Sequence, residues 1–518
     1  MIPPADVLVV GAGPTGLALA LQAHDHGARV RVVERRPEAF RPSRAMIVHP
    51  RTMELLRPLG VTDELLALGG VSPRACLHLG RSEVAVALGD LSLPGTAFPH
   101  PVFLRQMDVE TVLAGRLAAR GVPVERGVEL VGLDPADRPR ATLHSRAGLE
   151  TTAWRVVVGC DGVESAVRGR AGIGWPGGTY RAEAVLADVD LAGDLAVGVT
   201  HVAAGRRGLL FLFALGEGAP WRLLGTRAAG RDGRPVAPVP DDELQRMIDE
   251  AGVRARITRV AWSARMRLQH RVAERYRHGG VFLAGDAAHA SSPAGGQGMN
   301  TGIHDALNLG WKLALAGSSS DPGGLLDSYE DERRGTAHQV LALTHVLFWA
   351  EASTGRVPAF LRGAVAPRLA PVVPWLLRRR GLVEYAVRTL AQFSVGYRGS
   401  QLSVEGTPAR LGPPRAGDRL PDAEVTCDGR ATRLHELTAR PGVHVLLDRD
   451  AALPVPGTAG PLVHVHRVTS SPGTGVVAVR PDGHVGYRSA VADAAGLAGW
   501  LRRVGVAPRL VPGEVSRS

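Results

Sequence analysis

The sequence predicts an α/β fold, and the prediction depends on three segments: Gly11–Glu34, Gly159–Arg168 and Gly285–Asn300. Each segment follows an apolar run that is typical of a buried strand, and each passes through a polar turn into a stretch that can form a helix. Strand, turn and helix in this order are typical of a sheet whose strand ends carry a binding site. The 518 residues are enough for about two or three domains.

The first segment has the pattern of a dinucleotide-binding turn. Gly11 permits a tight turn, Gly13 lets the backbone approach a pyrophosphate, and Gly16 lets helix and strand pack closely. The helix that follows offers free N–H groups and a partial positive charge. Glu34 lies 18 residues beyond Gly16, a spacing that suits a carboxylate bound to a ribose hydroxyl. A glycine-rich turn that binds nothing is the alternative. The predicted cofactor contacts here are Gly11, Gly13, Thr15, Gly16, Glu34 and Arg35.

The other two segments favour FAD over NAD. Asp161 and Asp286 each follow a predicted strand, where a carboxylate can bind ribityl hydroxyls. The helix that begins near Gly298 can point its positive end at the flavin ring, where the reduced flavin carries negative charge. The predicted cofactor contacts in these segments are Asp161, Gly162, Gly285, Asp286, Pro293, Gly298, Met299 and Asn300.

On these three motifs the chain resembles the class A FAD-dependent aromatic hydroxylases, a family that includes para-hydroxybenzoate hydroxylase, the phenol hydroxylases and an aromatic polyketide hydroxylase subgroup. The resemblance covers about residues 5–400. It implies that the first motif binds the ADP part of FAD, that Asp161-Gly162 serves FAD and the approach of NAD(P)H, and that Gly285-Asp286 binds the ribityl chain. It also implies that Arg44, Arg105 and Gln106 contact the cofactor. Solvated arginines are the alternative for Arg44 and Arg105.

The resemblance further implies a monooxygenase that uses FAD, dioxygen and transient NADPH or NADH, with no metal. In the family, a flavin C4a-hydroperoxide attacks an electron-rich ring, and the site must exclude water. The loop with Pro293, Gly295 and Gly296 is expected beside the reacting position. No catalytic base is identified, and His289 and His49 are weak candidates only. A Baeyer–Villiger-type oxygenase and a non-catalytic flavin- or ligand-binding protein are alternatives.

We expect a Rossmann-like FAD-binding domain with an inserted β-sheet substrate domain and a C-terminal thioredoxin-like domain. Alternation and turn residues predict the sheet, and the resemblance implies that this sheet covers the substrate cavity. Phe211, Phe213 and Trp221 are therefore the candidates for contact with an aromatic substrate, and ordinary core residues are the alternative. The expected divisions are 1–178 for the first part of the FAD-binding domain, 179–270 for the substrate domain, 271–406 for the return of the FAD-binding domain with a helical region, and 407–518 for the thioredoxin-like domain without CxxC.

The composition of the chain limits which partners and which cellular compartment we expect. The net charge is +11, but there is no long basic run, so a nucleic-acid partner is not expected. The three cysteines, Cys76, Cys160 and Cys427, are widely spaced and suit a reducing cytoplasm. The apolar stretches are too short for a membrane span. The resemblance to the aromatic hydroxylases implies a small aromatic molecule as partner, a fused-ring phenol or quinone of polyketide type, and a homodimer is left open.

Overall fold

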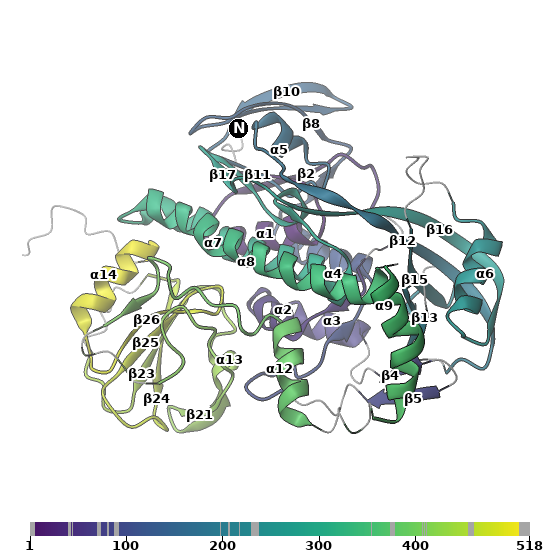
Figure 1. Cartoon of the computed structure of the whole chain (residues 1–518). Helices are drawn as coiled ribbons and strands as arrows, with labels where there is room; N and C mark the ends of the chain where they lie inside the picture. Colours follow the sequence, from purple (N-terminus) through teal and green to yellow (C-terminus); the bar gives the residue numbers. More distant parts are fainter. Residues whose placement is uncertain are drawn as a thin grey trace, which may run out of the picture.

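In the computed structural model, the description covers residues 6–506 except 40–42, 44, 70–73, 80–81, 88–92, 197, 206–207, 217, 229–237, 354, 373–374, 376–378, 407, 409, 411 and 454–459. Arg44, one of the expected cofactor contacts, lies outside the described residues. Three large sheets and a long central helix organise the chain (Figure 1). Within the described part, none of the helices is both long and apolar enough to cross a membrane.

The first large sheet is built from the predicted strands of all three motifs. Its order is β17 (Arg277–His278), β18 (Val281–Leu283), β11 (Val156–Gly159), β1 (Val7–Val10), β2 (Val30–Glu34) and β7 (Val124–Arg126). The strand β1 pairs in parallel with both β11 and β2, and β11 pairs in parallel with β18. The carboxyl ends of these strands therefore meet at one edge, and the α/β prediction is confirmed.

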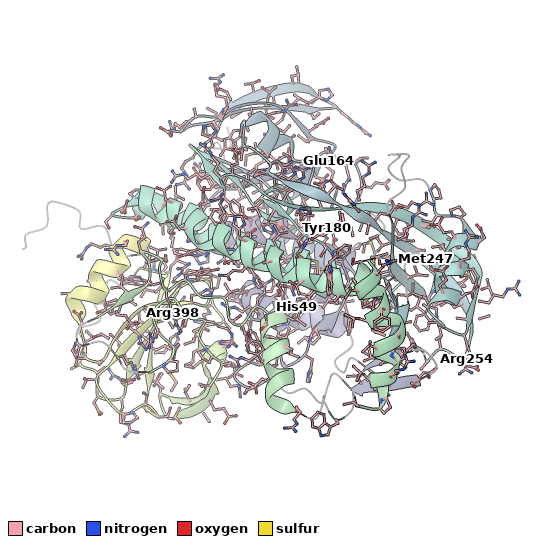
Figure 2. All side chains as sticks on the ribbon, viewed as in Figure 1. His49, Glu164, Tyr180, Met247, Arg254 and Arg398 are labelled. Carbon is pink, nitrogen blue, oxygen red and sulfur yellow. The ribbon has the colours of Figure 1, made fainter. Side chains whose placement is uncertain are left out.

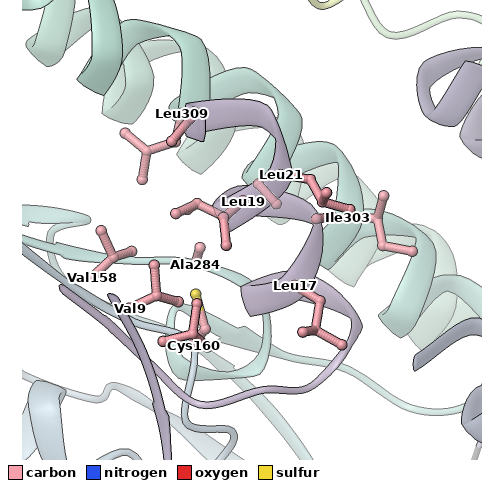
Figure 3. Packing of buried hydrophobic residues seen from close by; sticks show 14 of the residues in the cluster. Val9, Leu17, Leu19, Leu21, Val158, Cys160, Ala284, Ile303 and Leu309 are labelled. Carbon is pink, nitrogen blue, oxygen red and sulfur yellow. The ribbon is translucent and has the colours of Figure 1, made fainter. Parts of the chain in front are cut away.

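Two helices form the layer beside this sheet, and both are buried on nearly every side. Leu17 and Leu19 of α1 (Pro14–Asp25) are fully buried, as is Ile303 of α7 (Gln297–Leu315). They pack with Val9 and Val158 of the sheet (Figure 3). A fully buried leucine contributes about 1.5–3 kcal/mol, so this layer fixes the position of the turns at the strand ends.

The second large sheet carries the predicted substrate domain. Its order is β19 (His289–Ala290), β16 (Ala255–Val272), β12 (Gly177–Gly193), β15 (Trp221–Ala228), β14 (Gly208–Phe213), β13 (Val199–Gly205), β4 (Arg74–Leu79) and β5 (Ser82–Ala87). One face packs against α6 (Asp241–Glu250), and α8 (Pro322–Ala352) contacts β14 and β16. The hairpin of β4 and β5 extends this sheet with residues that come from far outside 179–270.

The remaining elements flank these sheets. Near the amino terminus of the chain, β3 (Ile47–Val48) pairs with β6 (Val102–Phe103), and the three-stranded sheet contains β8 (Glu129–Asp134), β9 (Arg140–Ser145) and β10 (Gly148–Ala153). The further helices are α2 (Pro50–Leu56), α3 (Thr62–Leu68), α4 (Gln106–Ala118), α5 (Ala166–Arg170), α9 (Arg356–Phe360), α10 (Ala366–Leu369) and α12 (Arg380–Leu390).

The C-terminal domain is a seven-stranded mixed sheet with helix α14 (Ala494–Val504) packed on it. The strand order is β20 (Val404–Glu405), β26 (Val485–Ser489), β25 (Val476–Val479), β23 (Val443–Asp448), β24 (Val463–Val468), β21 (Glu424–Cys427) and β22 (Arg430–Arg433). It docks on α7 and α8 through buried charges. Arg480 donates two hydrogen bonds to Glu332, at 2.7 and 2.8 Å, and Lys312 donates a third at 2.8 Å.

Candidate functional site

A cavity of about 510 Å³ lies between the carboxyl edge of the first sheet and one face of the second. At one end its walls come from the glycine turn after β1, at the other from β14, β15, β16 and α8. His49 and Tyr180 lie near the middle of the molecule, where these layers meet (Figure 2). The three motifs, which are far apart in the sequence, therefore line one space.

The turn after β1 leaves open space in front of a helix. A Cβ on Gly11 would collide with the carbonyl of Cys160, and one on Gly16 would collide with the carbonyl of Gly11. A Cβ on Gly13, in contrast, would meet no atom within 4 Å. Gly13 precedes the first residue of α1, so the free N–H groups of that helix face the cavity. This arrangement fits a pyrophosphate.

Glu34 is held beside the same turn. Its carboxylate accepts hydrogen bonds from the backbone N–H groups of Ala12, at 3.0 Å, and Arg36, at 3.1 Å. Glu34 and Arg35 both line the cavity. The carboxylate is thus oriented at the position where the glycine motif requires a partner for the ribose.

The carboxylate of Asp161 is bound by residues that follow it in the chain. Its carboxylate accepts hydrogen bonds from Ser165 Oγ at 2.5 Å and from the backbone N–H groups of Ala166 at 2.7 Å and Val167 at 3.1 Å. The side chain therefore holds the amino terminus of α5, while Asp161 and Gly162 still line the cavity. Burial raises the pKa of Asp161.

The turn after β18 presents Asp286 to the cavity. Asp286 is exposed and lines the space, whereas Gly285 is buried behind it. A Cβ on Gly285 would lie 2.5 Å from Thr15 Oγ1, so this glycine lets the first and third motifs pack together. The backbone N–H of Gly285 donates a hydrogen bond to the carboxylate of Asp305 at 3.0 Å, which holds the turn in place.

Asp305 anchors the site and was not predicted from the sequence. Its carboxylate also accepts from His289 Nε2 at 2.6 Å and from Arg333 Nε at 2.6 Å. The carboxyl is buried, yet Arg333 and His289 lower its pKa to about 2. No spacing along the chain indicates it, because its partners lie on other elements. His289 lines the cavity, but one ring nitrogen is committed to Asp305.

The amino terminus of α7 closes the cavity near its centre. Gly295 and Gly296 have φ angles of 68° and 64°, in the left-handed region that favours glycine. Asn300 lies fully buried behind this turn, where it donates to the carbonyls of Gly296, at 2.8 Å, and Ile47, at 2.9 Å. The N–H groups at the start of α7 therefore face a space that an anionic ring edge would fill.

His49 is a neutral structural group here. Its Nε2 donates to the carbonyl of Gly295 at 2.9 Å, and burial lowers its pKa to about 4. His49 does not line the cavity. As a base it would have to act from behind the loop of Gly295, so the geometry does not support that role.

Gln106 and Arg105, predicted as a pair, lie in different surroundings. Gln106 lines the cavity and donates to Glu110 at 2.8 Å. Arg105 instead forms a two-pronged ion pair with Asp108 at the start of α4, at 2.7 and 2.9 Å, and does not line the cavity.

The second sheet supplies an aromatic wall. Phe211 and Phe213 line the cavity, and their rings are parallel to within 7° with centroids 6.0 Å apart. Phe348 of α8 lines the same end. Trp221 does not: it is buried on the opposite face, in the cluster beneath α6, where its ring contacts His201. The core alternative therefore describes Trp221.

Glu351 is a further cavity residue that the sequence reasoning missed. It lies near the end of α8 and lines the cavity at its aromatic end. Burial raises the pKa of its carboxyl to about 7, and burial is the sole cause. A carboxyl of this kind can donate a hydrogen bond when protonated and accept one when ionised. A lone glutamate in a helix carries no sequence signal for such a role.

Most of the predicted residues line the cavity. They are Gly11, Gly13, Thr15, Glu34, Arg35, Gln106, Asp161, Gly162, Phe211, Phe213, Asp286, Pro293, Gly295, Gly296, Gly298 and Met299. Those that do not are Gly16, Arg105, Trp221, Gly285 and Asn300. Gly16, Gly285 and Asn300 support the lining residues from behind. An open helix terminus and a carboxylate that can bind a ribose lie at one end of this space and fit FAD. The aromatic end of the same space fits a ring-containing ligand.

Comparisons with known proteins agree with this fit. The family model described as "FAD binding domain" matches residues 4–344, and the one described as "Aromatic-ring hydroxylase, C-terminal" matches residues 413–508. The chain is 33% identical to rifampicin monooxygenase of Streptomyces venezuelae over 483 residues, which are 93% of this chain and 94% of that protein.

Solved structures are similar over almost the whole chain. Anhydrotetracycline hydroxylase from Streptomyces rimosus has a TM-score of 0.76 and 30% identity, with 97% of this chain and 99% of that one covered. Aklavinone-11 hydroxylase, solved with FAD and aklavinone, has a TM-score of 0.72 and 28% identity, with the same coverage. The resemblance inferred from the three motifs is therefore confirmed. The chain belongs to the family of FAD-dependent aromatic-ring monooxygenases.

Proposed function

We propose that the protein hydroxylates a fused-ring phenol or quinone of the aromatic polyketide type. The observation that carries the proposal is the wall of Phe211, Phe213 and Phe348 at one end of the cavity, across from the turns that fit FAD. Parallel aromatic side chains suit a flat, extended aromatic ligand. The two solved neighbours, an anhydrotetracycline hydroxylase and an enzyme bound to aklavinone, support a substrate of this type.

The chain's own residues would hold the cofactor in four places. The start of α1 with Gly13 would take the pyrophosphate, Glu34 the ribose, and Asp286 the ribityl chain. The start of α7, with Gly298 and Met299, would face the flavin ring. The bound flavin, reduced by NADPH or NADH, supplies the activation of dioxygen.

The aromatic wall has a second task, which is to exclude water. Phe213 also contacts Phe103, with ring centroids 6.0 Å apart, so the wall is supported from outside the cavity. When substrate fills the aromatic end of the cavity, little room is left for water beside the reacting ring. Exclusion of water prevents loss of the activated oxygen as hydrogen peroxide.

Glu351 would orient the substrate. Its carboxyl lies at the aromatic end of the cavity, and no charged neighbour contributes to its raised pKa. A phenolic hydroxyl, or a quinone oxygen when Glu351 is protonated, is the complementary group. A hydrogen bond there would fix which carbon of the ring faces the flavin.

The cytoplasm is the proposed location, because the cysteines of the described residues are free thiols, as a reducing compartment requires.

A homodimer is also proposed. Large apolar side chains are exposed along α8, α9 and the residues that follow, and a second copy could cover them. They include Val346, Trp349, Val357, Phe360, Leu361 and Leu369. Light scattering of the purified protein tests the dimer.

The test of the function is an assay with a panel of fused-ring phenols and quinones. The oxidation of NADPH and NADH, the uptake of oxygen and the release of peroxide are followed together, and the products are identified by mass spectrometry. A product with one added hydroxyl, formed from the compound that stimulates nicotinamide oxidation, supports the proposal. A ring-expanded ester would instead assign a Baeyer–Villiger reaction, and oxidation that no aromatic compound stimulates would refute the substrate class.

A further inference from the structure

A second group of reactive side chains lies on the substrate sheet, on the face opposite the aromatic wall. Cys76 and His78 lie two residues apart on β4, and His201 of β13 is the register partner of Cys76. One ligand atom from each residue lies within 4.8 Å of the other two. His201 contacts Trp221, which belongs to the cluster beneath α6, so the group faces away from the flavin cavity.

The two imidazoles converge on one point. His78 Nε2 and His201 Nδ1 are 2.9 Å apart, and both side chains are buried. Two nitrogens bound to one tetrahedral zinc ion lie about 3.3 Å apart, given zinc–nitrogen bonds of about 2.0–2.1 Å. A separation of a few tenths of an ångström more would therefore admit an ion where a single proton now bridges the rings.

The outer nitrogens of both rings already face acceptors. His201 Nε2 lies 3.3 Å from the carbonyl of Ala196, and His78 Nδ1 lies 3.6 Å from the carboxylate of Glu83. Histidines that bind a metal commonly donate their other N–H to a carboxylate or a carbonyl. With the bridging proton moved to Nδ1 of His78, the ring would donate to Glu83 and both histidines would have this arrangement.

The third ligand and an open position complete the set. Cys76 is half-buried, and its thiol is free. The group borders a cavity of about 320 Å³, which Asp194 and Arg254 also line. Arg254 lies at the outer end of the substrate sheet (Figure 2). Water from this cavity could occupy a fourth position.

We propose that Cys76, His78 and His201 bind a zinc ion, with water as the fourth ligand and Glu83 as the carboxylate that orients His78. One thiolate and two imidazoles are a donor set that suits zinc. The ion would connect the hairpin of β4 and β5 to β13, segments that are far apart in the sequence, and so brace the outer edge of the substrate sheet.

The proposal is tested on the FAD-saturated protein, purified without a polyhistidine tag, by calorimetric titration with zinc chloride. One ion should bind per chain. Titration in two buffers of different ionisation enthalpy should show about one proton released per ion, because the Cys76 thiol must ionise while the histidines only exchange a ring proton.

Matched variants separate this site from other zinc binding. Cys76→Ser and His201→Ala should each weaken binding at least tenfold, and Glu83→Gln about tenfold, as expected for a carboxylate behind a ligand. His464→Ala is the control. Its ring stacks with His444 in the C-terminal domain, and its Nε2 is committed to the carbonyl of Pro441 at 3.0 Å. Its loss should leave zinc affinity unchanged.

A spectroscopic measurement on the unaltered protein covers the case in which a variant fails to fold. Cobalt(II) in place of zinc should add a sulfur-to-cobalt charge-transfer band to the spectrum recorded before its addition. Zinc binding that persists in Cys76→Ser and His201→Ala, or an unaltered protein that binds no zinc and shows no such band, would overturn the proposal. The two histidines would then form a hydrogen bond and nothing more.

Discussion

Replacing Glu351 with glutamine tests the electrostatics of the substrate end of the cavity. Burial raises the pKa of this carboxyl from 4.5 to about 7. Each unit of pKa shift corresponds to about 1.4 kcal/mol, so ionising Glu351 costs about 3 kcal/mol more in the folded protein than in the unfolded chain.

The sign follows from proton binding. Between about pH 4.5 and pH 7 the unfolded chain has released the proton while the folded protein keeps it. The free energy of unfolding therefore falls as the pH rises through this window, and the contribution of Glu351 is lost above its folded pKa. Glutamine cannot ionise, so Glu351→Gln removes this part of the pH dependence.

The assay is urea unfolding of both proteins with saturating FAD at about pH 5 and about pH 8. Stability of Glu351→Gln relative to the unaltered protein should rise by about 2–3 kcal/mol between the two conditions. Glu64→Gln, at an exposed position on α3, is the control and should show no such change. A stability difference for Glu351→Gln that is the same at both pH values would show that burial does not keep this carboxyl protonated.

Three further variants test other residues. Asp286→Ala should weaken FAD retention without unfolding the protein, because the side chain is exposed to the cavity; undiminished flavin occupancy at low free FAD would place the ribityl chain elsewhere. Joint replacement of Phe211 and Phe213 by alanine should raise peroxide release at the expense of product. An unchanged ratio of product formed to nicotinamide oxidised would return both residues to a purely structural role. Arg480→Ala should destabilise the protein by about 3–5 kcal/mol in urea unfolding, since it leaves the buried Glu332 without its main partner; a loss below about 1 kcal/mol would show that the docking of the C-terminal domain does not depend on this pair.

The sequence predicted the parts of the site that are local. Strand, glycine turn and helix follow one another within each motif, so Gly11, Glu34 and Asp286 could be placed at the edge of a sheet from the order of residues alone. The supporting residues are not local. Asp305 connects α7 to Gly285, His289 and Arg333, and no spacing along the chain announces those contacts.

The faces of strands were predicted less well. Phe213 is the register partner of Arg222, so Trp221, one residue away, points to the opposite face of the sheet. A shift of one position separates a cavity residue from a core residue, and aromatic character alone does not resolve it. The pairing of β4 with β13 was out of reach for another reason, since it joins residues more than a hundred positions apart.

Hydroxylation at the cavity between the two sheets requires that the protein transfer an oxygen atom from dioxygen to an aromatic ring. A reaction under isotopically labelled dioxygen, with NADPH or NADH and the aromatic compound that stimulates oxidation, measures this transfer. One labelled atom is expected in the ring product for each nicotinamide oxidised. Label that is found only in hydrogen peroxide, at every substrate concentration and with each compound of the panel, would contradict the proposed function.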